Sequence, residues 1–147
     1  MELTVMQEKI GTFFKKYEQE FNRALKREVD LETITGFYTE EFIAANPMGV
    51  KTGENNDELK EAMTKGYDYY RSIGTKKMAC EDVQVTRLDN RHAIAHTRWR
   101  SFYEKEEKLI EIPFESHYLI QFRKENPLVF GWITGDESQL LKENGII

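Results

Sequence analysis

The chain has little cysteine, little proline and no long apolar run. Its one cysteine, Cys80, cannot form an internal disulfide, and no Asn-x-Ser/Thr site for N-linked glycans occurs. No segment approaches the about 20 apolar residues of a membrane-spanning helix, and the first residues lack the cationic and apolar blocks of a signal peptide. We therefore expect a cytoplasmic protein without a membrane partner, and a structural role for the Cys80 thiol.

Basic residues and the common cofactor motifs are also scarce. The 147 residues include 21 Lys and Arg against 26 Asp and Glu, which gives a formal net charge of −5 and argues against nucleic acid as a partner. The sequence contains no Gly-rich phosphate loop, no His-Glu-x-x-His pair and no nucleophile elbow. It therefore predicts neither a cofactor nor a metal.

The residues that are present suit one folded domain over 1–147. Apolar residues make up 39% of the chain and aromatic residues 12%, which is enough for a single hydrophobic core. Near the N-terminus, apolar residues recur at steps of three and four, as on one face of a helix: Met6, Ile10, Phe13, Phe14, Tyr17, Phe21, Ala24 and Leu25. Thr4 and Gln7 could close the start of this helix as a capping box.

Two shorter helices are expected next, and strands after them. Asp30 could cap a short helix that ends at Gly36, the segment 38–55 is expected to be irregular, and a third helix is expected from Asn55 or Asn56 to about Ile73. From there the period changes to two, which predicts strands at 76–89, 91–104, 109–123 and 128–136 before a last helical segment at 137–144. This order predicts an α+β domain with an antiparallel sheet packed on three N-terminal helices.

The face of each strand that carries more apolar residues is expected to point inward. A hairpin centred between Glu106 and Glu107 places Trp99 opposite Phe114 and Arg98 opposite Glu115. Pairing Phe122 with Phe130 would place four residues of the last strand on its inward face: Phe130, Trp132, Thr134 and Asp136. Small residues beside large rings leave space for a small molecule, so we expect a pocket lined by Tyr17, Phe42, Asn46, Tyr70, Ala95, Thr97, Trp99, Ser116, Tyr118, Trp132 and Thr134. A slip of one residue would instead turn His96, Arg98, Glu115 and His117 into the pocket.

The order of elements resembles a known superfamily. A long first helix, two further helices, a strand meander and the closing Val129-Phe130-Gly131-Trp132-Ile133 strand resemble the SnoaL-like branch of the nuclear transport factor 2-like superfamily. The segments 46–50, 52–57, 135–137 and 140–145 resemble a group of uncharacterised bacterial members. The resemblance implies a cone-shaped, strongly curved sheet and a homodimer contact on its convex side. The superfamily includes polyketide cyclases, ketosteroid isomerase and limonene-epoxide hydrolase alongside binding proteins, and no catalytic residue of these enzymes aligns here.

Two functions remain open. Asp136 could act as a general acid or base, with Tyr118 or Asn46 as a hydrogen-bonding partner, in a cofactor-independent isomerase, cyclase or hydrolase. Asp136 could equally cap the following helix, and Tyr118 could be a core ring. Because Asp136 is the only acid that the register sends inward, we favour a domain that binds a small apolar molecule.

The convex face carries its own polar group of residues. His96 and His117 fall opposite each other, beside Arg98 and Glu115, and could form a pH-sensitive patch or part of a metal site. Two ligands are too few for structural zinc. We therefore expect these four residues to form a homodimer interface.

Overall fold

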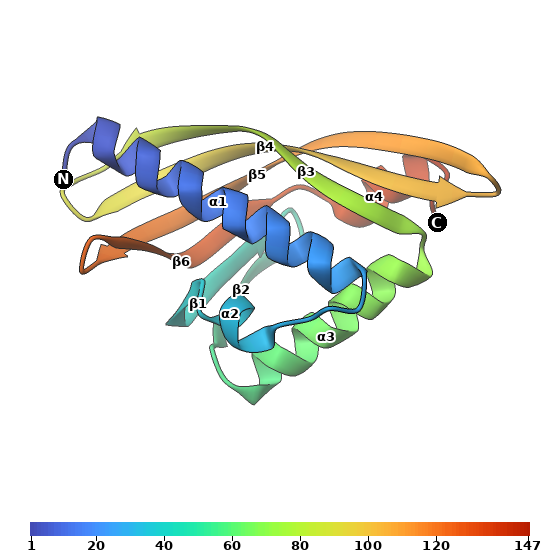
Figure 1. The fold of residues 1–147 in the computed structure, drawn as a ribbon, viewed down its shortest axis with the longest axis horizontal. Helices are drawn as coiled ribbons and strands as arrows, with labels where there is room; N and C mark the ends of the chain where they lie inside the picture. Colours follow the sequence, from blue (N-terminus) through green and yellow to red (C-terminus); the bar gives the residue numbers. More distant parts are fainter.

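The computed structural model describes residues 1–147 and contains four helices and one six-stranded sheet (Figure 1). The elements are α1 (Leu3–Leu25), α2 (Leu31–Thr35), β1 (Tyr38–Asn46), β2 (Gly49–Glu54), α3 (Asp57–Ser72), β3 (Thr75–Arg87), β4 (His92–Lys105), β5 (Lys108–Arg123), β6 (Asn126–Thr134) and α4 (Glu137–Glu143). The α+β class and the three N-terminal helices are confirmed. None of the helices combines the length and apolar character needed to cross a membrane.

Helix α1 lies along the concave side of the sheet. Met6, Ile10 and Phe14 are fully buried, as expected for the apolar stripe of an amphipathic helix. The predicted capping box of Thr4 and Gln7 is wrong. The helix already begins at Leu3 after Glu2, so Thr4 lies inside its first turn and cannot adopt the extended backbone of a cap.

The ends of α2 and α3 follow the sequence signals. The Asp30 carboxylate accepts a hydrogen bond from the Thr33 N–H at 3.1 Å, and the side-chain amide oxygen Oδ1 of Asn56 accepts one from the Glu58 N–H at 2.9 Å. After α3 the chain reverses at Gly74, whose φ is +87°. A Cβ at this position would lie 2.3 Å from the Glu104 carbonyl oxygen, so only glycine fits this turn.

The sheet has the strand order β2-β1-β6-β5-β4-β3, and its pairs are antiparallel except for the parallel pair of β1 and β6. The prediction that 38–55 is irregular is wrong, because this segment forms the β1–β2 hairpin. Its turn signals, Asn46-Pro47-Met48-Gly49, are the hairpin tip, where the Asn46 side chain accepts a hydrogen bond from the Met48 N–H at 2.8 Å. Alternation of buried and exposed residues is weak in β1, which is why its period was missed.

The β4–β5 register is confirmed. Trp99 pairs with Phe114 and Arg98 with Glu115, and both turn residues, Glu106 and Glu107, have positive φ as in a two-residue hairpin. This pairing puts Ala95, Thr97 and Trp99 on the concave face.

The β5–β6 register differs from the prediction. Phe122 pairs with Pro127 instead of Phe130, because Lys124 and Glu125 form a tight turn with positive φ before the Asn126-Pro127 step. An irregularity follows beside Leu119 and Ile120, and it turns Val129 inward and Phe130 outward, where the Phe130 ring contacts His92. Beyond it Trp132 and Thr134 face inward as predicted, opposite Tyr118 and Ser116.

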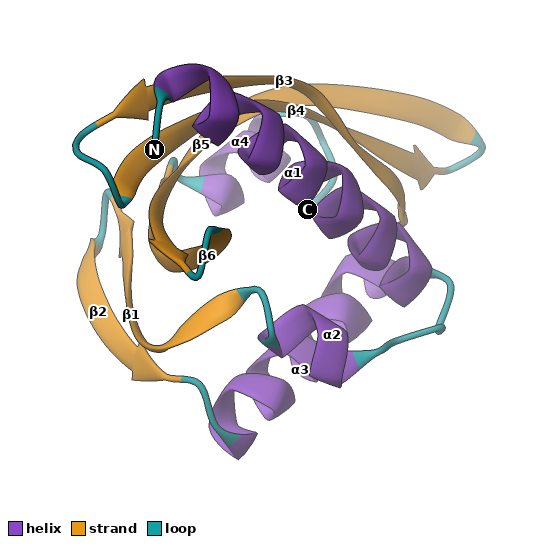
Figure 2. Cartoon of the chain, turned by 60° about the vertical axis from the view of Figure 1, so that its left-hand side comes forward, coloured by secondary structure: helices purple, strands orange, loops and turns teal.

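Register shifts also explain the shape of the sheet. A second one interrupts the β3–β4 pair between Cys80 and Asp82. Such bulges bend and twist a sheet, and Figure 2 shows the strands curving around the side that α1 covers. The curvature separates the ends of β4, β5 and β6 from α3, and this is where the functional site lies.

Candidate functional site

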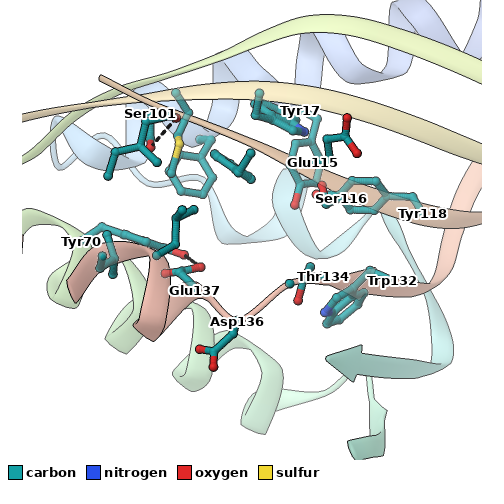
Figure 3. A pocket seen from close by; sticks show the side chains of 18 of the residues that line it. Tyr17, Tyr70, Ser101, Glu115, Ser116, Tyr118, Trp132, Thr134, Asp136 and Glu137 are labelled. Carbon is teal, nitrogen blue, oxygen red and sulfur yellow. Dashed lines mark hydrogen bonds between the residues drawn. The ribbon is translucent and has the colours of Figure 1, made fainter. Parts of the chain in front are cut away.

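A cavity of about 650 Å³ lies between the concave face of the sheet and helices α1, α3 and α4 (Figure 3). Its size falls within the range of small-molecule sites in proteins. It is lined by 24 residues, 16 of them hydrophobic, from the helices and from β1, β3, β4, β5 and β6. The site is therefore a product of the whole fold rather than of one loop.

Aromatic rings form much of the cavity wall. They are Tyr17, Phe21, Tyr38, Tyr70, Trp99, Tyr103, Phe114, Tyr118 and Trp132. Several are held by neighbouring rings: Trp99 stacks with Phe114 at 6.4 Å between centroids, and Trp132 stacks with Phe42 at 5.1 Å. The wall thus presents rigid apolar surfaces that lose little side-chain entropy when a ligand binds.

Three tyrosines from different elements meet at one end of the cavity. The hydroxyls of Tyr17 and Tyr38 are hydrogen-bonded at 3.0 Å, and the Tyr118 ring lies 5.8 Å from that of Tyr17. Burial raises the pKa of all three hydroxyls above the ordinary tyrosine value. They therefore remain neutral and can donate hydrogen bonds to a polar atom of a ligand.

A buried hydrogen-bond chain holds Trp99 in the wall. The Trp99 indole N–H donates to Thr97 Oγ1 at 2.8 Å, and Thr97 Oγ1 lies 3.0 Å from Ser116 Oγ and donates to the Ser116 carbonyl oxygen at 2.8 Å. Since Thr97 is fully buried behind Trp99 and Ser116, it positions the wall rather than lining it.

Three acidic residues are among those that line the cavity, Glu115, Asp136 and Glu137, but Glu115 turns its side chain to the convex face, opposite Arg98. The Asp136 carboxylate accepts a hydrogen bond from the Gln139 N–H at 3.0 Å and so caps α4. Glu137 turns toward α3, where its carboxylate accepts a hydrogen bond from the Tyr70 hydroxyl at 3.0 Å (Figure 3). Glu137 remains exposed to solvent on one side, and desolvation of its carboxylate against the cavity wall raises its pKa, a shift that the Tyr70 hydrogen bond opposes. No Lys, Arg or His lines the cavity.

The structure brings most of the predicted site residues together. Those in the cavity wall are Tyr17, Tyr70, Trp99, Ser116, Tyr118, Trp132, Thr134 and Asp136. Ala95 and Thr97 are buried behind them, and Phe42 lies outside the wall because it packs on the far side of Trp132. Asn46 is not near the site, because the unpredicted β1–β2 hairpin carries it to an exposed tip.

Sequence reasoning missed several residues of the wall, among them Tyr38, Tyr103 and Glu137. Tyr38 begins a strand that was not predicted, so its face was never assigned. Glu137 was missed because strand alternation was carried only as far as Asp136. The Gly135-Asp136-Glu137 sequence is a signal for a strand end followed by a capped helix, and applying it to Glu137 would have found the second acid.

The polar residues of the convex face also lie as paired in the prediction. His96 Nδ1 and His117 Nδ1 are 2.8 Å apart, His96 Nε2 is 2.9 Å from Thr86 Oγ1, and Arg98 forms an ion pair with Asp82 at 3.8 Å. No group of three or more His, Cys, Asp or Glu side chains is arranged to hold a metal ion.

Cys80 lies on β3, away from the cavity wall. Burial raises the pKa of its thiol to about 11, so the thiol is protonated at neutral pH. A protonated thiol is a poor nucleophile, which fits a structural role.

Comparisons with known proteins agree with this architecture. No curated protein matches the chain. Among solved structures, an NTF2-like protein with a cystatin-like fold from Novosphingobium aromaticivorans is 12% identical over 91% of this chain and 87% of its own, with a TM-score of 0.67. A ketosteroid isomerase-like protein from Erwinia carotovora is 14% identical over 88% and 94%, with a TM-score of 0.61. The β subunit of benzoate 1,2-dioxygenase from Burkholderia mallei is 13% identical over 90% and 91%, with a TM-score of 0.63.

At these identities the solved structures establish a shared fold, and they support the resemblance seen in the sequence. The family assignment comes from a sequence profile. The profile described as NTF2-like protein (DUF6841) matches residues 7–137, which is most of the chain. The chain therefore belongs to the NTF2-like protein family DUF6841.

Proposed function

We propose that this protein binds a small, largely apolar molecule in the cavity between the sheet and the helices. The observation that carries the proposal is the cavity of about 650 Å³ whose wall is largely aromatic. The neutral hydroxyls of Tyr17, Tyr38 and Tyr118 supply the few polar contacts that orient a ligand in such sites. A bound molecule would be held by apolar contact along most of its surface.

Methionine methyl groups provide the test. Of the five methionines, Met63 and Met78 line the cavity, whereas Met48 is 78% exposed at the β1–β2 tip. We would label the methionine methyls with ¹³C and add 2-naphthol, a neutral aromatic probe. The expected result is a saturable shift of the Met63 and Met78 signals while the Met48 signal stays fixed. No shift at millimolar probe would contradict the proposal.

A matched pair of variants locates the binding. Thr134→Phe places a ring in the cavity, whereas Ile133→Phe changes the neighbouring residue, which is 47% exposed on the other face of β6. The Thr134 variant is expected to weaken 2-naphthol binding at least about tenfold, the effect of losing one well-filled apolar contact. The Ile133 variant is expected to bind as the wild type does.

Catalysis is the second candidate, and the pair of Glu137 and Tyr70 favours it. A carboxylate with a raised pKa beside a hydroxyl could move a proton next to a ligand carbonyl, the general acid–base role first considered for Asp136 with Tyr118. One neighbour in fold is ketosteroid isomerase-like. The test is deuterium exchange at the carbon next to the carbonyl of 2-tetralone in D₂O, followed by NMR. Exchange above the buffer rate that Glu137→Gln abolishes would establish the activity, and exchange at the buffer rate would reject it for this ketone.

We also propose that the chain forms a homodimer through the convex face around His96, Arg98, Glu115 and His117. Its support is the polar pairing on this face, where the Arg98 side chain is 64% exposed. Sedimentation equilibrium of the wild type is expected to give a dimer and that of Arg98→Glu a weaker one. A monomeric wild type at micromolar concentration would contradict the proposal.

A further inference from the structure

We propose that the cavity selects small organic cations, with the cationic group beside Glu137 and the apolar part against the aromatic wall. The inference rests on the binding function proposed above and adds the chemical class of the ligand. Its basis is the combination of a largely aromatic wall, the Glu137 carboxylate beside Tyr70, and the absence of Lys, Arg and His from the wall.

The charged side chains of the cavity wall are all acidic. Apart from the tyrosines and from Glu115, whose side chain lies on the convex face, the ionisable acids of the wall are Asp136 and Glu137, and neither takes part in any ion pair of the structure. The hydrogen bonds from Gln139 to Asp136 and from Tyr70 to Glu137 carry no full positive charge. A cation beside Glu137 would therefore meet a carboxylate that no basic side chain neutralises, and an anion would be repelled.

The rings nearest Glu137 are placed to contact a cation as well. Tyr70 is hydrogen-bonded to Glu137, and the charge of Glu137 also contributes, after burial, to the raised pKa of Tyr103. Both rings line the cavity, and Phe21 packs on Tyr70 with 5.6 Å between ring centroids. The faces of aromatic rings attract cations within about 6 Å, so an ammonium group here would gain contacts that a neutral group of the same shape would not.

Matched probes separate charge from shape. Benzyltrimethylammonium and neopentylbenzene have the same shape, with nitrogen in the first replaced by carbon in the second, and phenylacetate carries the opposite charge. Binding is followed through Trp99 and Trp132, the only two tryptophans, both of which line the cavity. We expect the cation to bind at least about fivefold more tightly than the neutral probe, as cation–π and carboxylate contacts together predict, and phenylacetate to bind more weakly than either.

A second comparison assigns the preference to Glu137. Glu137→Gln keeps an oxygen that can accept the Tyr70 hydrogen bond but removes the charge, and Glu143→Gln makes the same change on α4 outside the cavity wall. The first variant is expected to weaken the cation by about two- to fivefold and to leave neopentylbenzene unchanged, whereas the second should change neither.

The outcomes distinguish the two proposals. If neopentylbenzene binds as tightly as the cation, or Glu137→Gln leaves the preference intact, selection of cations by Glu137 is overturned while the cavity remains a binding site. If neither probe changes the tryptophan emission at its highest soluble concentration, and 2-naphthol also fails to shift the methionine signals, both proposals fail.

Discussion

Two adjacent acids at the end of β6 have different environments. Asp136 ends the extended chain and turns its carboxylate back to the first turn of α4, whereas Glu137 is the first residue of that helix and reaches Tyr70 on α3. A change of one position along the chain thus separates a helix cap from a carboxylate whose pKa is raised by burial. The two roles give opposite expectations when each residue is replaced.

The raised pKa of Glu137 predicts how the stability of the protein depends on pH. Because its pKa is raised in the folded state, the protonated form favours folding, and this contribution is present below the unfolded value near 4.5 and is lost as pH rises through the folded value. The free energy of unfolding of Glu137→Gln, taken relative to that of the wild type, should therefore be larger at pH 7.5 than at pH 4.5. Urea unfolding at the two pH values measures this, with Glu143→Gln as control. The opposite trend would mean that attraction of the carboxylate to the α4 N-terminus outweighs burial.

Which acid faces the cavity could not be read from strand alternation alone. Strand alternation correctly predicts that Trp132 and Thr134 face inward. It does not apply to Glu137, because this residue belongs to helix α4, where the side-chain period is about 3.6 residues. The places of Tyr17, Tyr70 and Tyr118 in the cavity wall follow from the sequence, because these residues lie in long periodic segments. The place of Tyr38 does not, because it lies in a strand without clear alternation.

At the scale of elements, α4 closes one end of the cavity although it has only seven residues. Its Leu141 is 2% exposed and packs with Tyr103, Ile112 and Ile146. A helix this short depends on tertiary contacts and on its cap, because its own hydrogen bonds do not offset the cost of nucleation. The Asp136 cap therefore stabilises part of the cavity wall.

Asp136→Ala should consequently destabilise the protein by about 0.5–2 kcal/mol, the usual cost of losing a side-chain cap. Asp136→Asn keeps an acceptor for the Gln139 N–H and should remain close to wild type. Urea unfolding of both variants measures the difference. Equal losses in the two variants would show that the negative charge, not the capping hydrogen bond, supplies the stability.

The elements that could be predicted correctly are those specified by residues close together in the sequence. The β4–β5 hairpin was correct because its turn and both faces point to one register. The predicted β5–β6 register is wrong because it treats all four residues Lys124-Glu125-Asn126-Pro127 as the connection, although the reversal occurs at Lys124 and Glu125. The parallel pairing of β1 with β6 joins distant segments, and no local pattern in either strand specifies it.

At the scale of the whole molecule, the curved sheet and the three N-terminal helices enclose tyrosines that no single element could bury. Six of the seven tyrosines, namely Tyr17, Tyr38, Tyr67, Tyr70, Tyr103 and Tyr118, have a raised pKa, with burial as the largest cause in each case. For Tyr67 the pKa rises to about 12. These hydroxyls come from α1, β1, α3, β4 and β5, so their protonation reports on the packing of the entire domain.

Alkaline titration should therefore be cooperative. As pH rises above the ordinary tyrosine pKa of 10.0, the unfolded chain ionises its tyrosines while the folded chain keeps them protonated, so the free energy of unfolding falls with pH. Most of the tyrosinate absorbance at about 295 nm should appear in one step, together with loss of the circular dichroism of the fold, whereas protein in guanidinium should titrate smoothly near 10. Ionisation of most tyrosines with native circular dichroism would mean that water reaches the rings in the folded state. The cavity would then be too wet for the apolar binding proposed for it.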